Sequence, residues 1–404
     1  MTPVFCCGFE CGVVGYHFTN PGAPAEISST TVRSGNYSLR LNTTNATAYT
    51  FPVFGANNII HTSSTRHIGR VYVYFASLPS VSTALIRFGN TITNGPQIRF
   101  NASDSKLYAA VDTTLGATGV SVTTGVWYRI DFDFNVDTSG ADFCDGQING
   151  TQLGQATAAG SSSSTQTSEA IGLFTTCTAD VFFDDYITSS TPGDYPIGAG
   201  YINPFIPIAD GTHNIAGTGD FQRGNTGTDI LNTTTTAYQL IDDIPLPSGA
   251  VNEADCQRAV APPNATDYVE SVFGPAPGIS TPTTPPRAVE VFIIQHQVGT
   301  QTGNIRVALN DQGTTDDLLN QTGGGNTSYW STRKHYADPP SAASAWTLSG
   351  NGNFNDLRLR FYSSDAAPDQ CLDAAMIEAE FAPAAASLSP PPLPTINPTM
   401  LMNL

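Results

Sequence analysis

Val126-Trp127-Tyr128-Arg129-Ile130-Asp131-Phe132-Asp133-Phe134 is a segment in which polar and apolar side chains alternate. In an extended chain, Ile130, Phe132 and Phe134 fall on one side, and Asp131 and Asp133 fall on the other. This period of two is typical of a β-strand with one buried face and one face in solvent. The segment therefore predicts a half-buried strand that keeps both aspartates in water.

Short β-rich runs of the same kind recur through the rest of the chain, separated by Gly, Asn, Pro and Ser. Residues that favour helix cluster only around 371–380, so helix is predicted to be a minor component. Many strands without intervening helices predict a sandwich or jelly roll. The other runs are residues 38–41, 70–75, 84–88, 97–100, 107–111, 180–187, 205–208, 237–241, 288–294, 304–309, 356–361 and 376–381.

Two domains are expected because 404 residues exceed the size at which one hydrophobic core usually keeps growing. The strand pattern breaks at Thr191-Pro192-Gly193-Asp194-Tyr195-Pro196, where two prolines and a glycine interrupt it. We therefore predict an all-β protein of two tandem β-sandwich (jelly-roll) domains, residues 1–190 and 201–383, joined by a linker at 191–200. Pro207 is expected at a sheet edge, because proline donates no ladder hydrogen bond.

Residues 384–404 are rich in Ala, Ser and Pro and include Pro390-Pro391-Pro392-Leu393-Pro394. Such a segment cannot form a packed unit alone and is expected to be extended and polyproline-like. We interpret it as an assembly tail that inserts apolar side chains into a neighbouring subunit. The predicted anchors are Leu393, Ile396, Met400, Leu401 and Met402.

The chain is acidic, with 16 Lys and Arg against 34 Asp and Glu and a formal net charge of −18. This charge argues against binding to nucleic acid, which requires a basic surface, and disfavours anionic membranes. No apolar run approaches the roughly 20 residues that span a bilayer. The segment 1–8 lacks a basic n-region and an apolar stretch of signal-peptide length. Assembly in a cytoplasm with release by lysis is therefore expected.

Seven cysteines cannot all pair within one chain, so partly buried free thiols are expected. The cluster Cys6-Cys7 with Cys11 could suggest a metal, but no second cluster or His pair has zinc-finger spacing. Two pairings stay within one predicted domain and are the first to test. They are Cys144 with Cys177, and Cys256 with Cys371.

Several motifs resemble concanavalin A-like (LamG-type) jelly-roll domains, which recur in structural proteins of tailed bacteriophages. In the first half they are Gly8-Phe9-Glu10-Cys11-Gly12, residues 31–39, Gly125-Val126-Trp127-Tyr128-Arg129, Asp145-Gly146 with Gly150, and residues 181–186. The second half looks like the module that follows these domains in such proteins. Its motifs are residues 195–198, 243–245, 267–269, 288–291 and 345–348.

The resemblance raises the question of catalysis, because the fold family includes glucanases. Those enzymes place two carboxylates across a sugar cleft, and their Glu-x-Asp-x-x-Glu pattern is missing here. Asp131, Asp133 and Asp137 are the nearest imitation, and we interpret them as a solvated strand face. The sequence therefore predicts a protein that is not an enzyme.

The resemblance also implies a structural calcium near the terminal strand of the first domain, with Glu10 and Asp185 as the candidate ligands. Asp184 and Asp185 interrupt an apolar strand, so one carboxylate should point inward and need a partner. Hydrogen bonds from backbone amides are the alternative to a metal. Apart from this calcium, no cofactor is expected.

These features favour a structural virion protein of a tailed phage, either capsid-decorating, head-fibre or tail-associated. Its expected partners are other virion proteins and further copies of itself, and its expected location is the particle surface. One alternative is a phage module that binds a cell-surface glycan, since sandwich loops are common recognition surfaces. Another is the subunit of a secreted surface filament.

Overall fold

The computed structural model of the chain describes seventeen stretches of residues. They are 3–13, 18–19, 25–52, 66–88, 95–136, 141–159, 169–215, 220–232, 236–247, 252, 254–260, 266–297, 304–322, 330–341, 345–350, 352–363 and 370–383. The predicted anchors of the assembly tail, and Asp137, lie outside these residues.

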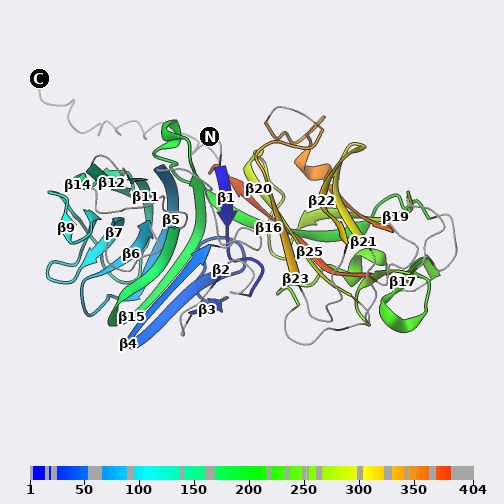
Figure 1. Cartoon of the computed structure of the whole chain (residues 1–404), viewed down its shortest axis with the longest axis horizontal. Coiled ribbons are helices and arrows are strands. Elements are labelled where there is room, and N and C mark those ends of the chain that lie inside the picture. The colour runs from blue at the N-terminus through cyan, green and yellow to red at the C-terminus, as the bar shows by residue number, and fades with distance from the viewer. Residues whose placement is uncertain are drawn as a thin grey trace, which may run out of the picture.

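The described residues form strands joined by turns and short 3-10 helices, and they contain no α-helix (Figure 1). The strands build two large antiparallel sheet systems, which confirms the predicted all-β class of two tandem β-sandwiches. No helix within the described ranges is long and apolar enough to cross a bilayer. We call the two systems the first and the second sandwich.

The first sandwich consists of β1 (Pro3–Cys7), β2 (Phe18–Thr19), β3 (Ala25–Ser28), β4 (Ser38–Pro52), β5 (Arg66–Ser77), β6 (Thr83–Phe88), β7 (Pro96–Asn101), β8 (Lys106–Val111), β9 (Thr114–Leu115), β10 (Val120–Ser121), β11 (Trp127–Asn135), β12 (Ala141–Ile148), β13 (Thr151–Gln152), β14 (Ala156–Ala159) and β15 (Glu169–Ser189). β15 pairs with β4 and then β1 along one edge, and with β6 and then β5 along the other, so it connects the two layers. β12 lies against β7 and β8 across the core between the layers.

The second sandwich consists of β16 (Tyr201–Asp210), β17 (Phe221–Arg223), β18 (Gln257–Ala259), β19 (Tyr268–Pro275), β20 (Pro286–Gln297), β21 (Asn304–Asp311), β22 (Thr314–Thr322), β23 (Trp330–Tyr336), β24 (Arg358–Ser363) and β25 (Gln370–Phe381). β25 pairs with β20 along one edge and with β18 and then β16 along the other. Every residue of β25 is buried, which overrides the helix-favouring composition of 371–380.

Pro207 lies in β16, which stands between β25 and β19 in the sheet order. The pairing of β16 with β25 ends at Phe205, and Pro207 pairs with Phe273 of β19. A register shift follows between Pro207 and Ala209. Proline is therefore accommodated where β16 has left one of its two neighbours.

β1 lies between the two sandwiches (Figure 1), and its described side chains, from Phe5 to Cys7, alternate between them. Phe5 and Cys7 belong to the core of the first sandwich, whereas Cys6 packs into a small cluster with Ile202 and Ala288 at the junction. Cys11, just beyond the strand, packs on Phe292 of the second sandwich. The three cysteines thus serve separate apolar clusters, as expected for free thiols.

We expect Phe5→Ala to loosen the junction as well as the first core. The Phe5 ring packs against Tyr186, and the Arg333 guanidinium of the second sandwich lies 3.9 Å from its centroid. Truncation should lower the free energy of unfolding by about 3–5 kcal/mol. In differential scanning calorimetry it should also split one transition into two.

Phe100→Ala is the matched control, because Phe100 is buried in the first core on β7. This variant should unfold at lower temperature but still in one transition. If both variants keep a single transition, β1 does not couple the two sandwiches.

Candidate functional site

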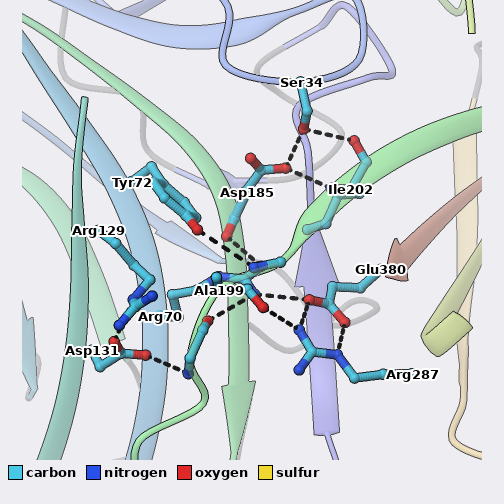
Figure 2. Close-up of polar contacts among 12 residues, drawn as sticks. Ser34, Arg70, Tyr72, Arg129, Asp131, Asp185, Ala199, Ile202, Arg287 and Glu380 are labelled. Atoms are coloured by element: carbon cyan, nitrogen blue, oxygen red, sulfur yellow. Dashed lines mark hydrogen bonds and ion pairs between the residues drawn. The ribbon is translucent and has the colours of Figure 1, made fainter. Parts of the chain in front are cut away.

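The junction between the sandwiches contains buried carboxylates paired with arginines, which Figure 2 shows in close-up. Arg70 of β5 donates to the Glu380 carboxylate of β25 at 2.8 Å, and both side chains are inaccessible to solvent. Arg287 of β20 donates to the same carboxylate, with its Nε 2.7 Å from Oε2. Glu380 is therefore held by one arginine from each sandwich.

Asp185 is the second buried carboxylate of the junction with several hydrogen-bond partners (Figure 2). Its Oδ1 accepts from the Ser34 hydroxyl and from the backbone N–H of Ile202, both at 2.6 Å, and Arg33 pairs with Oδ2. Its φ of 51° lies in the left-handed region, and the register of β15 against β5 shifts between Asp184 and Ile187. The bulge turns this carboxylate out of the ladder and toward the second sandwich.

Glu10 accepts the backbone N–H of Asn36 at 2.8 Å and donates its own N–H to Glu378 at 2.7 Å. Gly35, with φ of 64°, lets the loop approach, because a Cβ there would overlap the Glu10 carboxylate. Burial, then the charge of Asp184, raises the pKa of Glu10 well above its usual range.

Glu10 and Asp185, the predicted calcium ligands, are thus both buried at the junction and both hydrogen-bonded to protein groups. Each of the two carboxylates accepts a hydrogen bond from a backbone N–H group, which is the arrangement expected if no metal binds. Calcium binding by this pair stays a prediction.

Glu290 on β20 is a third buried carboxylate of the junction. It accepts from Arg333 Nε at 3.0 Å, from His335 Nδ1 at 2.8 Å and from the Cys6 N–H at 3.3 Å. Burial alone would raise its pKa, but the charges of Arg333 and then His335 outweigh burial and hold the pKa below its usual value. The backbone of β1 is therefore bound to an ion pair of the second sandwich.

Asp131 and Asp133 do not lie in water, and the interpretation of a solvated face is corrected. Both are buried on β11. Asp131 accepts from Arg129 at 2.7 Å and from the Gly198 N–H at 2.8 Å, while Asp133 pairs with Arg66. The segment that connects the sandwiches covers this face of the sheet and supplies one of these donors.

A cleft of about 610 Å³ opens where the sandwiches meet. The first sandwich contributes Ser29, Asn36 and Tyr37, and the second contributes Ile206, Asp242, Asp243, Ile244 and Pro277. Burial, then the neighbouring Asp243, raises the pKa of Asp242, and burial, then Asp255, raises that of Asp243. An aromatic ring, an amide and a carboxylate pair therefore line one concave surface.

The sequence did not single out this cleft. Tyr37 and Asp243 occur within motifs of the LamG-type resemblance, and the Asp242-Asp243 doublet is the one local signal for the cleft. Its walls come from positions about 200 residues apart in the printed chain.

All seven cysteines are buried free thiols in the described structure. Cys144 donates to the Gln97 carbonyl at 3.1 Å, and the Cys177 thiol interacts with the Thr43 side chain. Cys256 and Cys371, by contrast, lie side by side and interact with each other.

No protein-family model matches this chain, and no curated protein sequence matches it. Among solved structures, an endo-β-1,4-glucuronan lyase from the fungus Trichoderma reesei is similar at 12% identity and a TM-score of 0.35, over 49% of this chain and 100% of that one. An alginate lyase is similar at 12% and 0.33, over 45% and 96%. A Trypanosoma rangeli sialidase is similar at 11% and 0.30, over 41% and 27%. At these values the likeness concerns the β-sandwich fold alone.

These comparisons correct the prediction that the chain is not an enzyme. The three similar proteins are two lyases and a sialidase. The missing glucanase pattern does not by itself exclude catalysis, because one fold can carry several chemistries.

We expect Glu378→Gln to remove part of the pH dependence of stability. Burial raises the pKa of Glu378 to about 8 from an ordinary value of 4.5. Between these values the unfolded chain releases a proton that the folded chain keeps, so rising pH destabilises the fold. From pH 5 to 8.5, wild type should lose about 2–4 kcal/mol more than the variant in urea titrations.

Glu26→Gln is the control, because the Glu26 side chain is 55% exposed and pairs with Arg40 at the surface. It should leave the pH profile of wild type unchanged. Equal profiles for wild type and Glu378→Gln would contradict the raised pKa.

Proposed function

We propose that this chain is a structural surface protein of a tailed-phage particle, where copies of it pack beside other virion proteins. The observation that carries the proposal is the junction, in which Arg70 and Glu380 form an ion pair that excludes solvent. A subunit that repeats on a particle needs a fixed angle between its lobes. Buried pairs favour one geometry, because a small displacement leaves a charge desolvated and unpaired.

The surface chemistry supports the same proposal. A net charge of −18 keeps densely packed copies from adhering to anionic surroundings such as nucleic acid. The resemblance to LamG-type domains of phage structural proteins points in the same direction. Residues 384–404 would provide the contact to a neighbouring subunit.

Immunogold electron microscopy of purified particles tests this proposal. Antibodies raised against the recombinant chain should label one part of the particle in many copies, and mass spectrometry should find the protein in the same fraction. Label confined to cell-surface filaments or to the free protein fraction would contradict a virion role. Label limited to a fibre tip would instead favour receptor recognition.

A second candidate function, glycan binding, is favoured by the cleft at the junction. Tyr37 offers an aromatic face, and Asn36, Asp242 and Asp243 offer hydrogen-bonding groups around it. Concave sites with a few convergent polar groups are typical of small-ligand binding. On this proposal the cleft would hold a short stretch of a cell-surface glycan.

We expect Tyr37→Ala and Asp243→Asn each to weaken glycan binding by at least about tenfold, since either removes on the order of 1.4 kcal/mol or more. A glycan array followed by calorimetry with the best ligand measures this. Tyr108→Ala is the control, because Tyr108 lies on β8 outside the cleft. A ligand that binds all variants equally does not occupy the cleft.

A further inference from the structure

A buried group of two cysteines and one histidine lies at one end of the second sandwich. Cys371 is the second residue of β25, and His296 of β20 is its direct cross-strand partner. Cys256 comes directly before β18, which pairs with the opposite edge of β25 through Gln257 and Leu372. Three strands that are distant in sequence thus bring these side chains to one point.

The ligand atoms of Cys256, His296 and Cys371 all lie within 4.8 Å of one another, and all three residues are buried. In a tetrahedral zinc site with Zn–S near 2.3 Å and Zn–N near 2.0 Å, ligand atoms are separated by roughly 3.5–3.8 Å. A small contraction therefore converts the observed spacing into a coordination sphere.

A carboxylate fixes the orientation of the imidazole. Both oxygens of Asp373 lie within hydrogen-bonding distance of His296 Nδ1, at 2.7 and 2.8 Å. Metal-binding histidines characteristically donate one ring N–H to such a carboxylate and coordinate through the other nitrogen. The Nδ1 of His296 therefore faces Asp373, and Nε2 is the nitrogen that would coordinate a metal ion.

We propose that Cys256, His296 and Cys371 bind one zinc ion, with Asp373 positioning the histidine. Two thiolates and an imidazole select zinc over calcium or magnesium, which prefer oxygen ligands. The three protein ligands leave one coordination position for a further donor.

The ion would act as a structural staple. β17 and β18 comprise three residues each, so few ladder hydrogen bonds join β17 to β18 and β18 to β25. A metal bound by Cys256 on one side and by β20 and β25 on the other would fasten these two short strands to the sheet. Its binding free energy would add to the stability of the second sandwich.

Metal analysis of the full-length protein tests the proposal. Protein made in zinc-supplemented medium and purified with a reducing agent should contain about one zinc per chain. Cys256→Ser and Cys371→Ser should each lose it, whereas Cys144→Ser, a buried thiol of the first sandwich, should retain it. Asp373→Asn should weaken zinc binding about 10- to 100-fold.

A second measurement on the wild type keeps the proposal testable even if the cysteine variants fail to fold. Cobalt added to the metal-free wild type should give a thiolate-to-metal charge-transfer absorption, also in Cys144→Ser. The proposal is overturned if the wild type binds neither metal. It is equally overturned if folded Cys256→Ser and Cys371→Ser retain zinc, or if mass spectrometry finds a Cys256–Cys371 disulfide in the reduced preparation.

Discussion

Carboxylates removed from water at the junction impose the constraint on which the two-sandwich arrangement depends. An ion taken into the protein interior costs several kcal/mol unless a well-placed partner compensates it. Glu380 has two such partners, and one of them, Arg70, belongs to the other sandwich. If the sandwiches separated, Arg70 would lose this partner. The angle between the lobes is therefore fixed by charge compensation, while apolar packing around Cys6 and Ile202 fills the space between.

The same constraint shapes the local backbone. The left-handed conformation of Asp185 places its carboxylate against the donors of Ser34 and Ile202. The positive φ of Gly35 lets the loop bring the Asn36 N–H to the Glu10 carboxylate. The strained backbone of Asp185 persists because surrounding contacts over-determine it, whereas glycine adopts a positive φ without strain. The cleft lined by Tyr37 and Asp243 lies beside these contacts, so its two walls are held in register by the interactions that hold the sandwiches together.

The all-β class was predictable because alternation at period two and frequent turn residues are local signals. The buried charges were not, because Asp131 and Asp133 alternate with apolar residues in the same way whether water or another segment of the chain covers them. β25 shows the same limit, since its helix-favouring composition is overridden by neighbours on both edges. For the candidate sites, sequence paired Cys256 with Cys371 by domain membership. It could not include His296, which only the register of β20 against β25 places there.

Residues near the start of the chain bind residues near its end. The backbone N–H groups of Cys6 and Glu10 donate to Glu290 and Glu378, across separations of 284 and 368 residues. A ribosome releases β1 long before those acceptors are synthesised. β15 can pair with β1 once residue 189 has been made, but the N–H groups of Cys6 and Glu10 then still lack these acceptors, and a chaperone or another nascent chain could cover them. Closure of the junction is thus a late step of biogenesis, governed by long-range contacts rather than by the pairing of neighbouring strands.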